Sequence, residues 1–519
     1  LSSELHVLAH QLDRLSEKNR WSRDFTLNSL RHTLREIIAC FPVYRSYISS
    51  AGIHPQDHLY VQTAVVRAKR HNPAISASIF NFVRDMLLLH GPEGLSEQDR
   101  AEQLQFVGKF QQVTSPVMAK GLEDTAFYNY NRLLSLNEVG GDPGQFGVPP
   151  QLFHRHNEQR QARHPWGLST LSTHDTKRSE DVRARLNVLS EIPQEWQQRL
   201  ARWFLLNRRY RAQLEGVLAP DHNDEYLLYQ TLIGAWPLGP AGARVTAEFL
   251  GRIQQYMQKA IHEAKVNTSW INPDPAYDEA IGEFVARILD EERNAPFLRD
   301  FRAFQQRVSH YGLFNSLSQT LLKITSPGVP DTYQGTELWD FSLVDPDNRR
   351  PVDYDLRRQM LNDLKARLAD AGTDLAAFAR ELVQSKEDGR IKLYVTYRGL
   401  HWRRDHPGLL ANGEYLPAQA MGSRQDHVCA FVRRQGKMWT AAVVPRLVTR
   451  LAPRMGDLPL GAEAWDDTML HLPGVPVQQR CRNLFTGEEW TTSEQNGLAA
   501  LPLAQVLGHF PVALIAAQE

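Results

Sequence analysis

The spacing of apolar residues predicts that the first part of the chain is helical. Leu30, Leu34, Ile37, Ile38 and Phe41 recur at the intervals of one helix face. Pro42 follows and is expected to end that helix. The same pattern predicts helices over 63–70, 75–89 and 103–112, through most of 182–300, over 297–311 and over 391–404. A turn-rich loop at 267–275 interrupts the middle region.

Three short apolar runs, at 117–119, 166–171 and 321–325, are consistent with strands, and each leads into a cluster of polar side chains. Polar, ionisable residues at the exits of buried strands are typical of the C-terminal face of a (β/α)8 barrel, where active sites lie. The cluster after 166–171 contains His174 and Asp175. A solvated helix start explains that cluster about as well, because acidic residues favour helix N-termini.

The region from about 412 onward changes character. Short β-prone runs at 428–432, 439–444 and 511–515 are separated by turns, which predicts a small all-β C-terminal domain. The helical stretch that follows 172–181 is far longer than a βα unit needs before its next strand, so we interpret it as an insertion. The pattern therefore predicts an α/β protein with helical insertions and a β domain at its end.

The composition of the chain limits the kinds of partner that it is expected to bind. The chain has 59 basic and 59 acidic residues, which gives no reason to expect nucleic acid or a membrane surface as a partner. No apolar run approaches the roughly 18 residues of a transmembrane helix. Cys40, Cys429 and Cys481 are scattered and odd in number, which favours a reducing, cytoplasmic setting.

No CxxC, HExxH or Gly-rich phosphate loop occurs, so we expect no metal and no cofactor, although carboxylate loops leave a structural calcium open. The chain opens at Leu1 inside an amphipathic segment. We interpret that start as a piece of a longer protein, with a processed N-terminus as the alternative explanation.

Several long motifs resemble the α-amylase superfamily and, more closely, its maltooligosyltrehalose synthases. The matching stretches are 118–128, 136–143, 172–181, 327–335 and 344–353. The resemblance covers nearly the whole chain and implies the C-terminal part of a (β/α)8 TIM barrel with large helical insertions. It divides the chain into a helical subdomain (1–112), strands six and seven with their loops (113–185), a helical insertion (186–295), strand eight with closing helices (296–408) and a β-sandwich (409–519).

The family converts the reducing-end α-1,4 bond of maltodextrins to an α,α-1,1 bond, an intramolecular transfer in trehalose biosynthesis. The resemblance implies that Asp175 stabilises the transition state. It assigns substrate binding to His174, Lys177, Arg178, Lys120, Glu123, Asp124, Tyr128, Tyr333 and Gln334. It also implies a maltooligosaccharide substrate and a functional pairing with a maltooligosyltrehalose trehalohydrolase.

The chain departs from the family pattern in one respect. The superfamily's nucleophilic Asp, in an Arg-x-Asp context after strand four, and its acid Glu, after strand five, have no match before the motif at 118–128. Retaining chemistry needs two carboxylates about 5–5.5 Å apart. We therefore expect a missing N-terminal barrel half to be the partner that supplies them. Two alternatives stay open: another α-glucan hydrolase or glucanotransferase, and a non-catalytic α-glucan-binding protein.

Overall fold

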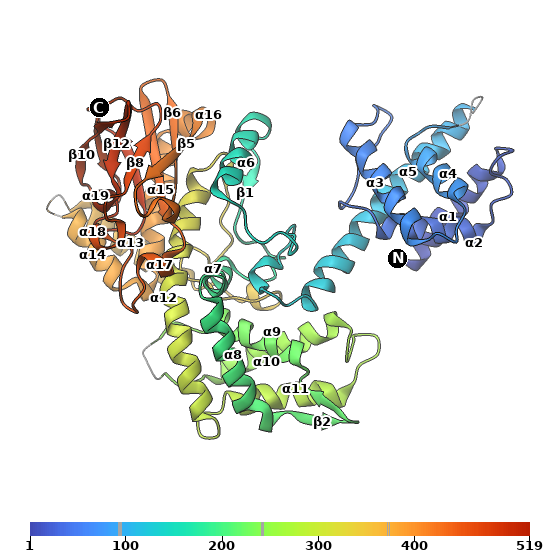
Figure 1. The fold of residues 1–519 in the computed structure, drawn as a ribbon, viewed down its shortest axis with the longest axis horizontal. Helices are drawn as coiled ribbons and strands as arrows, with labels where there is room; N and C mark the ends of the chain where they lie inside the picture. Colours follow the sequence, from blue (N-terminus) through green and yellow to red (C-terminus); the bar gives the residue numbers. More distant parts are fainter. Residues whose placement is uncertain (92–95, 240–242, 371, 373, 519) are drawn as a thin grey trace. The chain divides into compact units, whose positions relative to one another are not determined.

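The computed structural model describes residues 1–91, 96–239, 243–370, 372 and 374–518 (Figure 1). The chain forms two compact units, Leu1–Tyr130 and Asn131–Glu519. The finer division into five parts predicted from the sequence stays a prediction.

The first unit is helical, as the apolar spacing predicts. Its elements are α1 (Ser2–Glu17), α2 (Leu27–Ala39), α3 (Pro55–His71), α4 (Ala77–Leu87), α5 (Glu97–Met118), the π-helix η1 (Ala119–Glu123) and the 3-10 helix η2 (Ala126–Tyr128). Thr26 caps α2 by accepting a hydrogen bond from the Ser29 N–H. The predicted apolar face of α2 is buried, with Leu30, Leu34 and Ile37 in the core of this unit.

The prediction of a strand at 117–119 is wrong, because this segment is helical. Helix α5 begins with a capping box between Ser96 and Asp99 and runs through this segment into the π-helix η1. Phe106, Phe110 and Val113 form a buried face that leads directly into the triplet. An apolar run of three residues carries no period of its own, so its neighbours decide whether it is strand or helix.

The second unit contains a long central helix, α12 (Ala295–Thr325). The helix predicted over 297–311 is confirmed, but the strand expected at 321–325 is wrong, because the same helix continues to Thr325. Leu317, Leu321 and Ile324 extend the buried face to the end of α12. The Thr325 hydroxyl donates back to the Leu321 carbonyl at 2.7 Å, which closes the last turn.

The second unit also contains shorter helical elements. They are η3 (Leu134–Leu136), α6 (Pro150–Arg163), α7 (Glu180–Leu189), α8 (Pro193–Asn207), η4 (Arg208–Tyr210), α9 (His222–Ala235), α10 (Ala247–Ala264), α11 (Pro275–Ile288), η5 (Asp347–Arg349), α13 (Tyr354–Ala369), α14 (Leu375–Gln384), η6 (Lys386–Asp388), α15 (Arg390–Asp405), α16 (Pro407–Asn412), η7 (Gln425–His427), α17 (Val448–Leu451), α18 (Gly461–Trp465) and α19 (Leu503–Val506). The helix predicted over 391–404 is confirmed as α15. The turn-rich loop predicted at 267–275 separates α10 from α11.

A pair of short parallel strands supports the prediction that polar loops follow barrel strands at one face of the fold. β1 (Leu168–Ser169) pairs with β4 (Val329–Pro330), so that Leu168 faces Val329 and Ser169 faces Pro330. The strand predicted at 166–171 is therefore present but shorter, and β4 begins after the run expected to form the next strand. Leu168 is 77 % exposed, although its run resembles a buried strand. Within the described residues β1 pairs with β4 alone, which leaves its other edge open.

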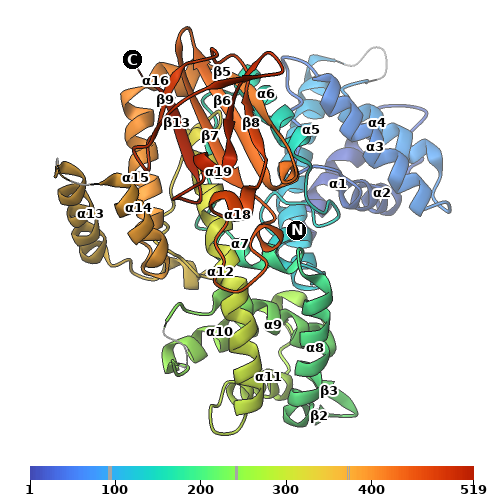
Figure 2. The same ribbon diagram turned by 60° about the vertical axis from the view of Figure 1, so that its left-hand side comes forward.

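The predicted C-terminal β domain is confirmed as one antiparallel sheet, with strand order β10-β9-β13-β7-β6-β5-β8-β12-β11. Its strands are β5 (Glu414–Met421), β6 (Val428–Gln435), β7 (Met438–Pro445), β8 (Met469–Leu472), β9 (Arg480–Asn483), β10 (Glu489–Thr491), β11 (Ser493–Gln495), β12 (Leu498–Pro502) and β13 (Ala513–Ala517). Figure 2 shows these strands side by side, with α12 running from the sheet toward α8 to α11. A separate hairpin joins β2 (Ala212–Leu214) to β3 (Val217–Ala219). In the part of the chain that the structure describes, no helix combines the length and apolarity that a membrane crossing requires.

A buried carboxylic acid lies at the start of α9. Asp224 accepts a hydrogen bond from the Tyr277 hydroxyl at 2.5 Å. Burial, together with the negative charge of nearby Asp221, raises the pKa of Asp224 to about 6. The unfolded chain releases this proton at its ordinary pKa of about 3.9, whereas the folded state holds it longer. Its contribution to the free energy of unfolding is therefore complete below about pH 4 and is lost as the pH rises through about 6.

Replacing Asp224 by Asn is expected to remove that pH dependence. Relative to Asp224→Asn, the wild-type protein should lose about 3 kcal/mol of unfolding free energy between about pH 4 and pH 7. Denaturant unfolding of both proteins across this range measures the difference. Asp363→Asn, at an exposed site on α13, is the control and should follow the wild type. A difference between Asp224→Asn and the wild type that stays constant with pH would contradict the assignment.

Candidate functional site

The loop after β1 presents His174 and Asp175 at its tip. The Thr176 side-chain oxygen accepts the Thr173 N–H at 2.6 Å, and the Thr173 side-chain oxygen accepts the Asp175 N–H at 3.2 Å. These two threonines close a tight turn around the pair. His174 and Asp175 are exposed, whereas Thr176 to Ser179 are buried beneath them. The turn therefore fixes the backbone while leaving the Asp175 carboxylate open to a ligand.

Glu138 anchors this turn from a second loop. Its Oε1 accepts the Lys177 N–H at 2.8 Å and its Oε2 accepts the Arg178 N–H at 3.1 Å. The Arg183 guanidinium lies 3.7 Å from the same carboxylate. Hydrogen bonds from backbone N–H groups to a carboxylate are stronger than neutral ones. Glu138 therefore holds the residues that immediately follow the Asp175 turn.

Removing the Glu138 carboxylate should loosen the turn. In Glu138→Ala, amide hydrogen exchange in a peptide covering 172–179 is expected to rise about tenfold or more, because two charge-assisted bonds are lost. Mass spectrometry of exchanged peptides measures this. Asp142→Ala is the matched control, since Asp142 binds the Gly144 N–H within its own loop. Equal exchange in the wild type and Glu138→Ala would rule out the anchoring role.

Asn348 joins the loop after β4 to the loop after β1. The Tyr333 hydroxyl donates to the Asn348 carbonyl at 3.1 Å, and the Asn348 side-chain amide donates to the His174 carbonyl at 3.1 Å. Tyr333 and the His174–Asp175 tip are thus linked through one residue. Gln334 follows Tyr333 and is exposed. The structure therefore links Tyr333 to the loop that carries His174 and Asp175, while the binding roles of these residues stay predictions.

Lys177 and Arg178 are buried. Arg178 is 1 % exposed and its guanidinium donates to the Tyr256 hydroxyl of α10 at 2.7 Å. An isolated antiparallel bridge pairs Arg178 with Leu343. In this structure Arg178 supports the loop that carries Asp175 from its buried side. That Lys177 and Arg178 contact substrate stays a prediction.

Two basic side chains of α10 hold the loop at 344–353 in place. Arg252 donates to both carboxylate oxygens of Asp347, at 2.8 Å each, and Lys259 binds Asp345 at 2.8 Å. The hydrogen bond from Lys259 offsets the burial of Asp345 and leaves the pKa of that carboxyl lowered. A bidentate arginine–carboxylate pair restricts orientation as well as distance. This pairing fixes the segment from which Asn348 reaches His174.

A buried ionic layer lies below the tip. Lys392 of α15 contacts Glu180 and Asp181, the first residues of α7, at 2.9 Å each. Burial disfavours the charge on Lys392, but the two carboxylates outweigh it and raise the pKa of Lys392. Glu180 also accepts from Ser172 at 3.2 Å, which connects the ionic layer to the Asp175 loop.

The other predicted site residues lie in the first unit. Lys120 pairs with Asp124 at 2.5 Å, and Glu123, which is buried, accepts a hydrogen bond from the Tyr44 hydroxyl. Tyr128 is buried in η2. Their predicted place at the same rim as Asp175 stays a prediction.

Three supporting residues were not identified from the sequence: Glu138, Asn348 and Lys392. Glu138 lies in the Gly- and Pro-rich loop at 137–144, which also contains Asp142, and within the stretch 136–143 that resembles the family, so the resemblance was the available signal. Asn348 lies in the family-like stretch 344–353, but neither Asn348 nor Lys392 can be matched to its contact residues from the sequence, because those residues are distant in the chain. The separation between Lys392 and Asp181 is 211 residues.

The parallel pair β1 and β4, each followed by a loop that carries a predicted site residue, has the arrangement found at the C-terminal ends of neighbouring strands in a (β/α)8 barrel. No protein-family model matches the chain. A curated Mycobacterium tuberculosis (strain H37Rv) protein, assigned as a maltooligosyl trehalose synthase, is 38% identical over 366 residues, covering 70% of this chain and 41% of that protein.

Solved structures show the same likeness. The maltooligosyltrehalose synthase from Arthrobacter ramosus matches with a TM-score of 0.77 and 32% identity, over 100% of this chain and 56% of that one. A hypothetical maltooligosyl trehalose synthase of Sulfolobus tokodaii matches with a TM-score of 0.64 and 26% identity, over 98% of this chain and 58% of that one.

The chain is thus a relative of the maltooligosyltrehalose synthases in both sequence and fold, as the motifs predicted. The predicted fold class is confirmed: part of a (β/α)8 barrel with helical insertions, followed by an all-β domain. The chain spans about half the length of the synthases that it matches.

Proposed function

We propose that the chain forms the part of a maltooligosyltrehalose synthase that carries the transition-state-stabilising carboxylate. The reaction is an intramolecular transfer, that of a (1→4)-α-D-glucan 1-α-D-glucosylmutase, which turns the reducing-end α-1,4 bond of a maltodextrin into an α,α-1,1 bond. The observation that carries the proposal is the exposed Asp175, held in a fixed turn by Thr173, Thr176 and Glu138.

Asp175 suits this role because the turn fixes its backbone before substrate arrives. Cleavage of a glycosidic bond develops positive, oxocarbenium-like charge on the sugar ring. A carboxylate carried beside that charge on a fixed turn stabilises the transition state. His174 lies at the same tip, and Tyr333 is linked to it through Asn348; we propose that both side chains form hydrogen bonds with sugar hydroxyls.

The two further carboxylates of the reaction are proposed to lie in the portion of the synthases that this chain does not span. One attacks the anomeric carbon and the other protonates the leaving oxygen. The released glucose then attacks through its own 1-hydroxyl, so water must be excluded. We place this activity in cytoplasmic trehalose biosynthesis, together with a maltooligosyltrehalose trehalohydrolase that acts on the product.

Incubation with maltohexaose tests the proposal. Reducing ends and chromatographic chain length are followed together. Loss of reducing ends without a change in chain length is the expected result once the barrel portion with the two other carboxylates is supplied. Shorter products with new reducing ends would show a hydrolase or glucanotransferase and would overturn the proposal.

A further inference from the structure

A groove of about 690 Å3 lies in the second unit, between α6 and the β domain. One face of α6 forms its first side, and β5, η7 and β6 form the other. Figure 2 shows α6 beside β5, against which it packs. The volume falls within the roughly 300–1,000 Å3 of small-molecule sites. Among the described lining residues none belongs to the loops that carry Asp175 or Tyr333.

The inner wall of the groove carries His154, whose protonated ring nitrogen can be assigned. His154 is 9 % exposed, and its Nδ1 lies 2.8 Å from the Tyr415 hydroxyl. That hydroxyl accepts the Asn157 side-chain amide at 3.2 Å, and within the described residues its single hydrogen has no acceptor besides Nδ1. Nδ1 is therefore the acceptor. Burial lowers the pKa of His154, which keeps the ring neutral at pH 7, so the ring hydrogen lies on Nε2.

The Nε2–H of His154 has no acceptor among the described residues. Donors on side chains buried to this degree are almost always paired in folded proteins. The ring lines the groove, and Nε2, which is not sealed in the core, is the ring nitrogen that a ligand can reach. The Tyr415 hydroxyl and the packing of Phe153 and Tyr415 against the ring hold it in place. The groove therefore presents one fixed hydrogen-bond donor to a ligand.

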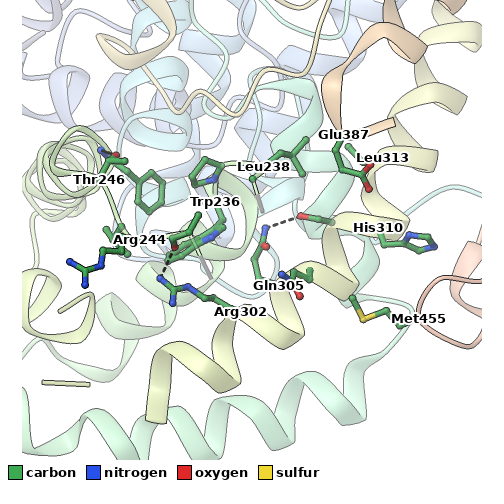
Figure 3. A pocket seen from close by; sticks show the side chains of 17 residues that line it. Trp236, Leu238, Arg244, Thr246, Arg302, Gln305, His310, Leu313, Glu387 and Met455 are labelled. Atoms are coloured by element: carbon green, nitrogen blue, oxygen red, sulfur yellow. Dashed lines mark hydrogen bonds between the residues drawn. The ribbon is translucent and has the colours of Figure 1, made fainter. Parts of the chain in front are cut away.

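A second cavity, beside α12, differs in this respect (Figure 3). There Gln305 donates to the Ser309 oxygen at 2.7 Å, and Arg302 donates to the Ala243 carbonyl at 2.9 Å. These lining groups form their hydrogen bonds within the protein. The His154 Nε2–H does not, which directs attention to the groove beside α6.

The charges around the groove balance, which favours an uncharged ligand. Two basic side chains, Arg155 and Arg446, are matched by two acidic ones, Glu158 and Asp426. Burial raises the pKa of the Cys429 thiol to about 11, so this lining group is neutral as well. The lining also includes three amide side chains, those of Gln151, Gln419 and Gln425. Amides and hydroxyls both donate and accept hydrogen bonds, so such a wall suits a neutral ligand with many hydroxyls.

We propose that the groove between α6 and β5 binds a neutral oligosaccharide. The His154 Nε2–H donates to one sugar hydroxyl at the inner wall, and the amides and charged groups of the rim bind further hydroxyls. Small apolar side chains of β5 and β6, such as Ala418 and Ala430, leave room for the sugar rings between them. The choice of an α-glucan as that sugar rests on the proposed function. The site holds a maltodextrin at a place separate from the Asp175 loop.

Maltotriose binding to the full chain tests the site. Protein labelled with 15N-histidine gives a ring signal for His154, identified by its absence in His154→Gln. We expect this signal to shift on titration with maltotriose. Isothermal titration calorimetry compares the variants: His154→Leu, which loses the donor, should bind about tenfold more weakly, whereas His154→Gln, which keeps an N–H, should stay within about threefold of the wild type.

Gln419→Ala provides a test that does not depend on the buried histidine. Gln419 is an exposed residue of β5, so its replacement leaves the core intact, and binding should weaken about fivefold, the effect of one lost hydrogen bond. Gln435→Ala is the matched control, because Gln435 is an exposed glutamine of β6 that is not among the described lining residues. Equal affinity of the wild type and Gln419→Ala, together with equal affinity of His154→Leu, would overturn the proposal.

Asp175→Asn separates this groove from the proposed active site. Maltotriose that still shifts the His154 signal in Asp175→Asn, and binds more weakly to Gln419→Ala, supports the groove even if maltohexaose is never converted. Binding that Asp175→Asn abolishes and Gln419→Ala leaves unchanged would place the sugar at the Asp175 loop and overturn the groove proposal alone. Absence of any His154 shift up to the solubility limit of maltotriose would also overturn it, whether or not maltohexaose is converted.

Discussion

Replacing Asp175 by Asn is expected to reduce the turnover of maltohexaose by about 10²–10³-fold, in protein that also carries the nucleophile and the acid. The substitution keeps the size of the side chain and its hydrogen-bonding shape but removes the negative charge. That charge matters most when the sugar becomes cationic, so kcat should fall more than KM rises. Initial rates of reducing-end loss over a range of maltohexaose concentrations measure both constants.

The fold should tolerate this change. The Asp175 side chain is exposed, and the turn is closed through the backbone N–H of Asp175 and not through its carboxylate. The free energy of unfolding should stay within about 0.5 kcal/mol of the wild type. Asp355→Asn, at an exposed carboxylate of α13, serves as the control for activity. A rate within tenfold of the wild type would show that Asp175 does not stabilise the transition state.

The helices could be predicted because their signal is local. The apolar face of α2 and that of α12 repeat every three or four residues, and burial follows that repeat. The strands of the C-terminal sheet could be predicted, but the barrel strands could not be placed reliably, because β1 and β4 contribute two residues each to their pairing. At 117–119 and 321–325 a short apolar run continued the apolar face of a helix. Neither run alternated between apolar and polar residues as a half-buried strand does.

Part of the candidate site could also be predicted, because that part has a local signal in the sequence. His174 and Asp175 stand within a dense polar motif, which the sequence displays directly. Their supports come from far along the chain: Glu138 from an earlier loop, Asn348 from the loop after β4, and Lys392 from α15. Contacts across such separations depend on how the elements pack, and a single sequence holds no record of that packing.

Replacing Lys392 by Met is expected to destabilise the second unit by about 3–5 kcal/mol. Lys392, Glu180 and Asp181 are 1 %, 2 % and 0 % exposed at their side chains. Methionine fills a similar volume but leaves both carboxylates buried without their central cation. The loss should exceed that of a surface ion pair several times over, because water cannot reach the stranded charges. Denaturant unfolding measures the change, and Lys365→Met, at an exposed lysine of α13, is the control.

A second substitution shows whether stranded charge is the cause. Asp181→Asn removes one of the two charges while keeping an oxygen that accepts the Asp340 N–H, a bond of 2.8 Å in the wild type. Lys392→Met combined with Asp181→Asn should therefore lose less than the sum of the two single changes, with a coupling of about 1–3 kcal/mol. Additive losses would mean that the cost comes from packing instead. Because Glu180 also binds Ser172, Lys392→Met should raise amide exchange across 172–179, so that the buried ionic layer and the Asp175 turn loosen together.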